Sequence, residues 1–234
     1  VLMLAGIKDI LIIVNKGQLN QFKKILSNGE RFGVNIKFIE QTFPRGLPDA
    51  FILGEKFIGK DNVSLILGDN FFYAQSLTKK LKDCIKLSSG CKVLLHPVNS
   101  PELYGVATIN KKKKVLQLQE KPKQSKSNLA VTGLYFFDNK VVEYSKSLKP
   151  SKRKEIEIID LLNKYRKKNK LKAEFLGRGG AWLDTGSISD FYNTSSFVSA
   201  LENRQGLKIA CLEEIAFNYN WINKKQIVDA IKFY

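Results

Sequence analysis

Short apolar runs of strand length alternate with longer segments of helical periodicity along the whole sequence. This alternation constrains the fold more than any other feature of the chain. Runs rich in β-branched residues are typical of buried strands, and amphipathic segments between them are typical of crossover helices. The pattern therefore predicts an α/β domain with a Rossmann-like, mixed and mostly parallel central sheet flanked by helices. At 234 residues the chain is long enough for one such domain, 1–234, to bury a core.

The expected elements change in spacing along the chain. The first part predicts strands at 10–14, 34–39 and 63–67, the first and third buried, and helices at 18–26, 48–57 and 77–87. Closely spaced strands follow, at 92–95, 105–109, 115–119 and 131–137, and indicate a subregion of hairpins. The last part predicts helices at 155–167 and 187–203, a strand at 172–176 and a short closing helix.

The first residues do not have the pattern that usually opens a doubly wound domain. Val1 to Ala5 is typical of the last turn of an apolar helix, with Gly6 in the position that ends it. A domain of this class usually opens with a strand and a phosphate-binding loop, because ligands bind at the carboxyl ends of the strands. We therefore expect the sequence to be truncated, with its first strand and phosphate loop missing.

Charge raises the question of a polyanionic partner, because the formal net charge is +17 and the pI about 9.7. The basic clusters have local explanations: Lys111 to Lys114 is predicted to be a solvated turn, and Lys164 to Lys170 ends a helical pattern. Neither cluster contains the interleaved aromatic residues that stack on bases, which disfavours nucleic acid as a partner. No apolar run approaches the ~20 residues that span a bilayer. We expect no membrane association and a cytoplasmic protein.

Cysteine and histidine usage excludes several site types. The three cysteines, Cys84, Cys91 and Cys211, have no C-x-x-C spacing and no histidine cluster beside them, which disfavours a disulfide framework and a zinc site. His96 is the one histidine, and it follows a strand-like run. A structural role is favoured over a general base for this residue.

A carboxylate follows a predicted buried strand at Leu67-Gly68-Asp69-Asn70. An aspartate at a strand's carboxyl end is well placed to hold Mg²⁺ on a nucleotide phosphate. The same tetrapeptide is also ordinary turn chemistry, so by itself it leaves both interpretations open.

A second aspartate stands in a similar position, in Ala181-Trp182-Leu183-Asp184-Thr185-Gly186. Two strand-end carboxylates could converge on one hard cation. The alternative is that Asp184 caps the helix expected to begin near Ser187.

Six motifs occur in the order and spacing found in glucose-1-phosphate thymidylyltransferases, and the sequence resembles this family over essentially its whole length. They are Leu67-Gly68-Asp69-Asn70, Tyr104-Gly105-Val106, Glu120-Lys121-Pro122, Val131-Thr132-Gly133-Leu134-Tyr135, Trp182-Leu183-Asp184-Thr185-Gly186 and Arg204-Gln205-Gly206-Leu207. The resemblance implies a nucleotidyltransferase that joins dTTP to glucose 1-phosphate, giving dTDP-glucose and pyrophosphate for dTDP-rhamnose and surface polysaccharide synthesis. It also implies a homo-oligomer, a tetramer.

Residue roles are carried over from the same resemblance. Asp69 and Asp184 would bind Mg²⁺, Lys121 would neutralise the sugar phosphate, and Arg153 would lie near the phosphates. Solvent exposure in a basic turn is an equal alternative for Arg153. The hexose would be held by Tyr104, Gly105, Glu120, Val131 and Tyr135, and the nucleoside by Gln41, Gly46 and Leu47.

Departures from the family pattern define the alternatives. Pro48-Asp49 stands where the family usually has Ala-Gln, so a uridylyltransferase or another sugar-nucleotide pyrophosphorylase remains an alternative. The family's glycine-rich, triphosphate-gripping segment has no counterpart in this sequence, so we expect low or no activity from the chain as it stands. A noncatalytic sugar-nucleotide-binding paralogue is the alternative from a different functional class.

Overall fold

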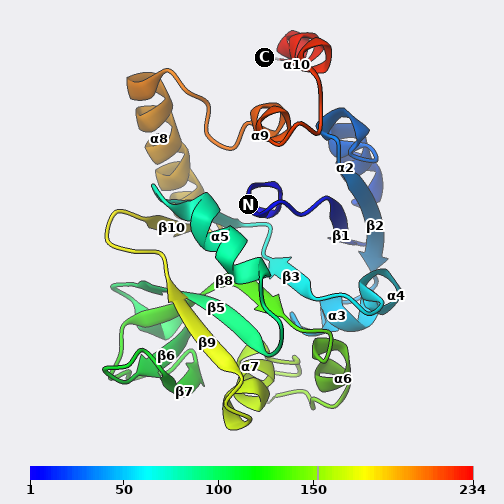
Figure 1. Cartoon of the computed structure of the whole chain (residues 1–234). Helices are drawn as coiled ribbons and strands as arrows, with labels where there is room; N and C mark the ends of the chain where they lie inside the picture. Colours follow the sequence, from blue (N-terminus) through cyan, green and yellow to red (C-terminus); the bar gives the residue numbers. More distant parts are fainter. Residues whose placement is uncertain (152, 234) are drawn as a thin grey trace. The chain divides into compact units, whose positions relative to one another are not determined.

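The computed structural model describes residues 1–151 and 153–233 and divides into two units (Figure 1). Pro44–Leu183 forms one, here called the sheet unit. Val1–Phe43 and the chain from Asp184 onward form the other, here called the terminal unit.

A six-stranded mixed sheet organises the sheet unit. Its strands are β3 (Val63–Ile66), β5 (Cys91–Pro97), β6 (Gly105–Ile109), β7 (Val115–Glu120), β8 (Leu129–Phe137) and β9 (Leu171–Phe175). β8 is central and runs antiparallel to β5 on one edge and to β6 and β3 on the other. β9 pairs with β5 in parallel, and β7 pairs with β6 as a hairpin.

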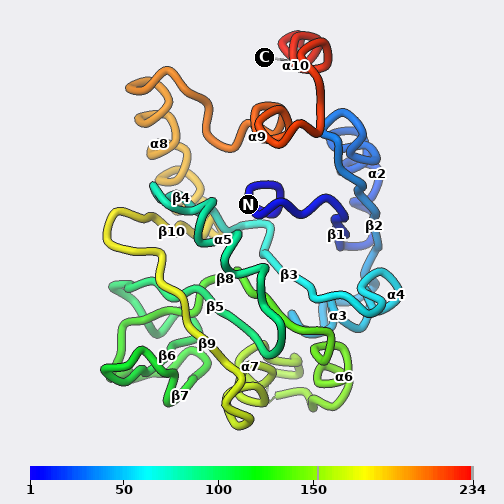
Figure 2. Tube along the Cα trace, viewed as in Figure 1, coloured from blue at the N-terminus to red at the C-terminus, as the bar shows by residue number. Residues whose placement is uncertain are grey.

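Five α-helices and a 3₁₀ turn accompany this sheet. They are α3 (Asp49–Leu53), α4 (Glu55–Ile58), α5 (Leu77–Ile85), η2 (Pro101–Leu103), α6 (Val141–Lys146) and α7 (Ile158–Lys167). In Figures 1 and 2, α6 and α7 lie side by side at the lower end of the unit. Their apolar faces join β8 in one core, where Phe137 packs edge-on against Phe51 at 5.2 Å and lies 5.5 Å from Tyr165, centroid to centroid.

A polar contact crosses this core. The buried carboxylate of Asp138 accepts hydrogen bonds from the Tyr165 hydroxyl at 2.8 Å and from the Gly90 N–H at 2.6 Å. Both oxygens therefore have a donor, which makes a buried carboxylate tolerable.

A small second sheet pairs β4 (Asn70–Tyr73) with β10 (Ala181–Asp184). β4 begins directly after the Leu67-Gly68-Asp69 turn, and β10 follows β9 after a glycine-containing loop. The sheet therefore links two of the motifs that the sequence singled out.

The terminal unit joins the two ends of the chain. Its elements are α1 (Leu2–Ala5), β1 (Asp9–Asn15), α2 (Leu19–Leu26), η1 (Glu30–Phe32), β2 (Asn35–Gln41), α8 (Ile188–Gln205), α9 (Leu212–Asn218), α10 (Lys224–Ala230) and η3 (Ile231–Phe233). β1 and β2 pair in parallel, and Met3, Phe32 and Val34 share a core with Ala216 and Ile222.

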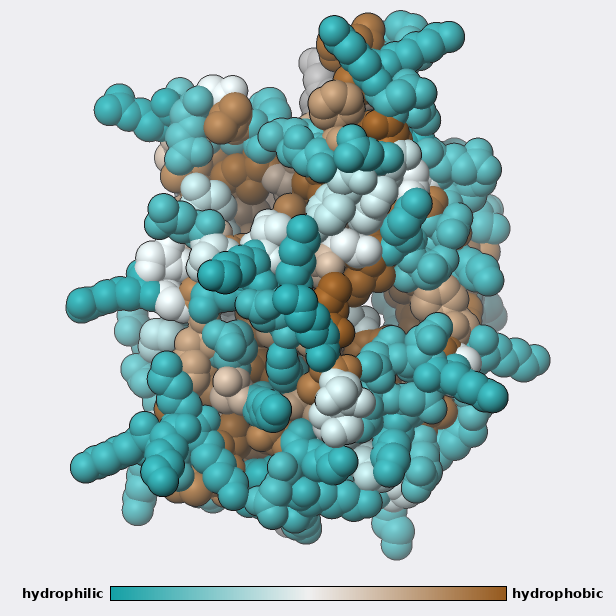
Figure 3. All heavy atoms as spheres, viewed as in Figure 1, coloured by the Kyte–Doolittle hydropathy of each residue, from teal (hydrophilic) through white to brown (hydrophobic). Residues whose placement is uncertain are grey.

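α8 is an 18-residue helix with clear end signals. Ser187 caps its first turn by accepting the Asp190 N–H at 3.1 Å, and Gly206 ends it in the left-handed conformation at φ 69°. Most of its surface is exposed, including Ile188, Phe191 and Tyr192. Apolar atoms appear among hydrophilic ones in this region of the space-filling view (Figure 3).

Most predicted elements are confirmed within a few residues, and α/β architecture is confirmed. The predicted helix over 48–57 is instead two short helices separated at Gly54. β4 and α6 were not predicted, because each is short and lacks a distinctive period. The described part of the chain contains no helix long and apolar enough to cross a membrane.

Two expectations about the sheet need correction. The mostly parallel pattern holds for β1–β2 and β5–β9, but β3, β5 and β6 all run antiparallel to β8. β6 and β7 pair as a hairpin, whereas β3 and β5 pair with β8 from distant parts of the chain, so local patterns do not encode the direction of those pairings. β1 and β3 were predicted to be buried, but most of their residues are half-buried. Each has one paired neighbouring strand among the described residues.

Candidate active site

The best-defined candidate site in the sheet unit lies where β6 and β7 meet. Glu120, the last residue of β7, stands opposite Gly105, the first residue of β6. A Cβ atom on Gly105 would lie 2.6 Å from Ile159 Cδ1 and 3.4 Å from Glu120 Oε2. The space beside Gly105 is therefore occupied by the Ile159 side chain, which would have to move to admit a larger residue.

Charged groups surround the Glu120 carboxylate. Burial raises the pKa of Glu120, and the charge of Glu157 raises it further, whereas Lys121 and Arg153 act in the opposite direction. Arg153 lies 3.6 Å from Glu120 and 3.8 Å from Glu157, measured from Nη1 to the carboxylate oxygens. Arg153 is also 3.4 Å from Glu155 through Nη2. The arginine is thus held by three acidic side chains of the described structure.

Tyr135 extends the same neighbourhood into the core. Its side chain is 3% exposed, and burial together with the charge of Glu120 raises its pKa, so the hydroxyl stays protonated at neutral pH. Val131 lies four residues earlier on β8 and is also buried. Val131 and Tyr135 belong to the same buried cluster, although the pairing of β8 with β5 is irregular between them.

Lys121 follows Glu120 in a strained backbone conformation. Its φ is 38°, in the left-handed region that non-glycine residues seldom adopt. The Lys121 N–H donates to the Tyr104 carbonyl at 3.1 Å, which ties this turn to the residue before β6. Strain of this kind persists where the surrounding structure over-determines it, and it is common at functional sites.

Asp69 lies in the exposed turn before β4, and its carboxylate has a defined neighbour. The Asn70 side-chain amide donates to Asp69 Oδ1 at 2.8 Å. Asn70 Oδ1 accepts in turn from the Trp182 indole at 2.6 Å and from the Gly133 N–H at 3.0 Å. Asn70 therefore connects β4 with β8 and β10.

Trp182 also joins this amide to an aromatic group. Its ring packs edge-on against Tyr104 at 5.0 Å and against His96 at 6.5 Å, centroid to centroid. Burial lowers the pKa of His96, so its imidazole is neutral at pH 7. Tyr104 is thus held between the Glu120 turn and the Trp182 ring.

Asp184 is the last residue of β10, and its Oδ1 accepts the Gly186 N–H at 2.9 Å. Ser187 is the N-cap of α8. The alternative in which Asp184 caps this helix is therefore excluded.

The predicted nucleoside residues occupy two different surroundings. Gln41 ends β2 in the terminal unit, and its side-chain amide donates to Asn15 Oδ1 at 2.9 Å. In the sheet unit, Gly46 has φ 106°, and a Cβ atom there would lie 2.1 Å from the Ile156 carbonyl oxygen. Leu47 packs at the margin of the core.

By unit, the predicted site residues of the sheet unit are Gly46, Leu47, Asp69, Tyr104, Gly105, Glu120, Lys121, Val131, Tyr135 and Arg153. Gln41 and Asp184 belong to the terminal unit. Within the sheet unit, the structure brings Glu120 together with Gly105, Lys121, Arg153 and Tyr135.

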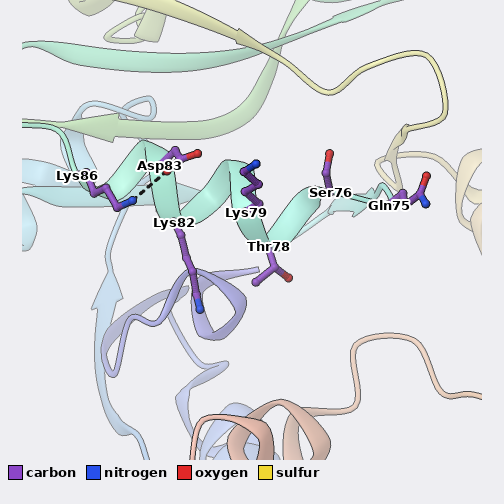
Figure 4. A pocket seen from close by; sticks show the side chains of 7 residues that line it. All are labelled: Gln75, Ser76, Thr78, Lys79, Lys82, Asp83 and Lys86. Carbon is purple, nitrogen blue, oxygen red and sulfur yellow. Dashed lines mark hydrogen bonds and ion pairs between the residues drawn. The ribbon is translucent and has the colours of Figure 1, made fainter.

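Two further observations concern ligands. Among the described residues, no group of three or more His, Cys, Asp or Glu side chains is arranged to hold a metal ion. A hollow of about 520 Å³ lies along α5 and is lined by Gln75, Ser76, Thr78, Lys79, Lys82, Asp83 and Lys86 (Figure 4). None of the predicted site residues lines it.

Comparisons with known proteins define the family. The profile of the nucleotidyl transferase family matches residues 1–200. The chain belongs to this family, and the prediction of a nucleotidyltransferase is confirmed. The glucose-1-phosphate thymidylyltransferase of Neisseria meningitidis is 47% identical over 97% of this chain and 79% of its own length. The enzyme of the same name from Mycobacterium tuberculosis is 42% identical over 97% of this chain and 78% of its own length.

Solved structures agree with this assignment. A Bacillus anthracis protein, solved in complex with a sucrose under the name glucose-1-phosphate thymidylyltransferase, is 37% identical. It superimposes with a TM-score of 0.77 over 84% of this chain and 78% of its own. A UDP-glucose pyrophosphorylase complexed with UDP-glucose is 23% identical, with a TM-score of 0.72 over 85% of this chain and 83% of its own. This second likeness supports the fold alone, and the Rossmann-like fold class is confirmed.

Sequence reasoning missed Asn70, Trp182 and Glu157 as members of the site. Asn70 and Trp182 were inside quoted motifs, adjacent to or two residues from a candidate aspartate, but they carry no metal-binding or acid-base signature. Glu157 follows Arg153 by four residues, a spacing at which an ion pair could have been suspected.

Proposed function

We propose that this protein transfers a thymidylyl group from dTTP to glucose 1-phosphate, giving dTDP-glucose and pyrophosphate. The observation that carries the proposal is the 47% identity, over 97% of the chain, with a relative named for that reaction. The cluster around Glu120 supports it, because a half-buried carboxylate is suited to accept hydrogen bonds from hexose hydroxyls.

In this reaction a phosphate oxygen of the sugar attacks the α-phosphorus of the triphosphate, and the bond to the β-phosphate oxygen breaks as pyrophosphate leaves. The attacking oxygen is already anionic at neutral pH, so the step needs no general base. The protein's task is to position the two phosphates and to neutralise their charge. We assign Lys121 to the sugar phosphate and Arg153 to the reacting phosphates.

The hexose would be held by Tyr104, Gly105 and Glu120, with Val131 and Tyr135 beneath it. The protonated Tyr135 hydroxyl can donate where Glu120 accepts, so the pair offers complementary partners to a sugar. Because Arg153 is paired with three carboxylates, we expect substrate phosphate to compete with these carboxylates for the guanidinium.

For the nucleoside, we assign Gln41 to the edge of thymine and Gly46 with Leu47 to close backbone approach. The amide of Gln41 can pair with both a donor and an acceptor. Asp49, at the departure from the family pattern, is buried and paired with Arg45 at 2.6 Å. Its carboxylate is therefore committed to an internal pair.

We propose Mg²⁺ as the cofactor, held by Asp69 and Asp184. The donor set fits, because Mg²⁺ is usually bound by one or two carboxylates together with substrate phosphates and water. The pairing of β4, which follows Asp69, with β10, which ends in Asp184, supports the assignment. When bound, the ion would neutralise charge on the reacting phosphates.

We also propose that both units form one nucleotidyltransferase domain, since the family profile spans the whole sheet unit and part of the terminal unit. A cytoplasmic location, a homotetramer and a role in dTDP-rhamnose and surface polysaccharide synthesis follow from the proposed substrates and the family resemblance. No membrane or nucleic-acid partner is part of the proposal.

Pyrophosphate release from dTTP and glucose 1-phosphate tests the proposal. The assay is run with dTTP and, in a parallel series, with UTP in its place. We expect turnover with dTTP. Turnover with UTP alone would favour a uridylyltransferase, and dTDP-glucose binding without turnover would favour a noncatalytic paralogue.

Substitution of the two aspartates tests the metal assignment. Asp69→Asn and Asp184→Asn should each lower turnover strongly, because each removes a charged oxygen ligand. Their far-UV circular dichroism and melting temperature should stay close to those of the parent protein. A near-normal rate in either variant would remove that residue from the proposed site.

A further inference from the structure

One side-chain amide connects three strands that are distant in sequence. Asn70 opens β4, its Oδ1 accepts from Gly133 on β8 at 3.0 Å, and the same atom accepts from Trp182 on β10 at 2.6 Å. The partners are 63 and 112 residues away along the chain. Contacts of this separation are absent from an isolated turn, so they indicate a tertiary constraint on Asn70.

The donors around Asn70 determine which way its amide points. An indole N–H and a backbone N–H can only donate, so the atom that faces Trp182 and Gly133 must be the oxygen. The amide nitrogen is then directed to Asp69, where it donates to Oδ1 at 2.8 Å. The flip ambiguity of an asparagine is resolved here by its partners.

Gly133 is shaped for this contact. A Cβ atom at this position would lie 2.5 Å from Asn70 Oδ1 and 2.8 Å from Leu67 Cδ1. Glycine weakens a strand, and it often marks a place where another group approaches the backbone closely. The Gly133 carbonyl also accepts the Leu67 N–H at 2.9 Å, so β8 holds the turn of Asp69 from both sides.

We propose that Asn70 is a positioning residue that orients the carboxylate of Asp69, with Trp182 and Gly133 holding its amide in place. The inference rests on the proposed metal role of Asp69 and adds a requirement to it. The oxygen that accepts from Asn70 is held in one orientation, so the carboxylate meets a cation without first losing rotational freedom. Removing a hydrogen-bonding partner behind a metal ligand lowers metal affinity or activity by typically 10- to 100-fold.

Three substitutions separate this role from a general effect on folding. Asn70→Ala removes the amide. Trp182→Phe removes one donor and keeps an aromatic ring beside Tyr104. Trp221→Phe is the matched control, because it removes the indole N–H of the terminal unit's tryptophan and leaves the Asn70 contacts in place.

The first measurement tests the contacts themselves and needs no ligand. In ¹H–¹⁵N spectra the two tryptophans give two indole signals, and Trp221→Phe assigns them. We expect Asn70→Ala to shift the Trp182 indole signal and to speed its exchange with solvent, leaving the Trp221 signal unchanged. An unchanged Trp182 signal would overturn the contact on which the inference is built.

The second measurement tests the consequence, with Mn²⁺ as a spectroscopic probe of an oxygen-ligand site. Mn²⁺ binding in the presence of dTDP-glucose is followed by electron paramagnetic resonance and calorimetry, for the parent chain, the three variants and Asp69→Asn. Asn70→Ala and Trp182→Phe should bind Mn²⁺ about 10- to 100-fold more weakly, and Trp221→Phe like the parent. If Asn70→Ala does not fold, Trp182→Phe decides the outcome.

The outcomes distinguish the inference from the proposed function. Parent-like Mn²⁺ affinity in Asn70→Ala and Trp182→Phe, with loss of binding in Asp69→Asn, would overturn the positioning role and leave the proposed function intact. Parent-like affinity in Asp69→Asn would remove Asp69 as a ligand, and the positioning role with it. In turnover assays, a rise in the half-saturating Mg²⁺ concentration with an unchanged KM for glucose 1-phosphate would support the inference further.

Discussion

The loop at Gly46 allows a quantitative test of how the sheet unit is assembled. Gly46 has φ 106°, and its neighbour Arg45 accepts the Ile156 N–H at 2.8 Å, which joins this loop to the segment before α7. A Cβ atom on Gly46 would lie 2.1, 2.8 and 2.9 Å from the Ile156 oxygen, nitrogen and carbonyl carbon. All three are backbone atoms, so no side-chain rotation can relieve the overlap.

Gly46→Ala should therefore be strongly destabilising. An alanine held in the left-handed region costs about 1–2 kcal/mol. Reaching an ordinary contact at 3.4 Å from the oxygen requires the two backbone segments to separate by about 1.3 Å, which breaks the Arg45–Ile156 hydrogen bond. That loss adds about 1 kcal/mol for the bond, and more if either group stays buried without a partner. We expect a decrease in the free energy of unfolding of about 3 kcal/mol.

Gly177→Ala is the matched control in the same unit. Gly177 has φ 95°, and nothing lies within 4 Å of its added Cβ, so only the backbone term of about 1–2 kcal/mol applies. Urea unfolding is followed by tryptophan fluorescence in a Trp221→Phe background, so that the signal comes from Trp182 in the sheet unit. If the free energies of unfolding of the two alanine variants differ by less than about 0.5 kcal/mol, the close contact with Ile156 does not contribute to stability, and the reasoning fails.

Three further measurements probe the interior. Tyr165→Phe should lower the free energy of unfolding by about 1–3 kcal/mol in urea titrations, because the buried Asp138 carboxylate loses one of its donors. Burial raises the pKa of Cys84 to about 11 and that of Cys91 well above its usual value, so a disulfide reagent at pH 8 should titrate at most one thiol rapidly before denaturation and three after it. The raised pKa of Glu120 means that stability from this group is present at low pH and lost as pH rises through the folded-state pKa. The free energy of unfolding of Glu120→Gln should therefore rise relative to that of the parent between pH 4 and pH 7. A difference between the two proteins that stays constant with pH would contradict a raised pKa for Glu120.

Local periodicity was enough to predict most of the elements. The strands β1 and β2 and the helices α2, α5 and α8 lie close to the segments that their apolar patterns indicated, because the signal for each lies within the segment itself. The capping serine and the ending glycine of α8 are likewise local. Strand pairing was harder to predict. β3 has the composition of a parallel strand, yet it lies antiparallel to β8, whose partner residues are some 70 positions away.

The candidate site was predictable where residue type alone indicates chemistry. Asp69, Glu120 and Lys121 carry charges suited to phosphates, sugars or cations, and their motifs were recognised. For Arg153 the sequence allowed either a phosphate contact or exposure in a basic turn. The structure shows a third environment, in which three carboxylates surround the guanidinium. Such a cluster depends on how β7 and the start of α7 pack, which no local pattern encodes.

The residues that the sequence could not assign are those that act through others. Three of the six motifs, at Leu67, Val131 and Trp182, looked like separate segments, each with its own candidate ligand or pocket residue. In the structure one atom, Asn70 Oδ1, joins them through a glycine that leaves room and an indole that donates. Within its own motif, neither Gly133 nor Trp182 has an evident role. Both are required if they hold the Asn70 amide and this amide orients the carboxylate of Asp69.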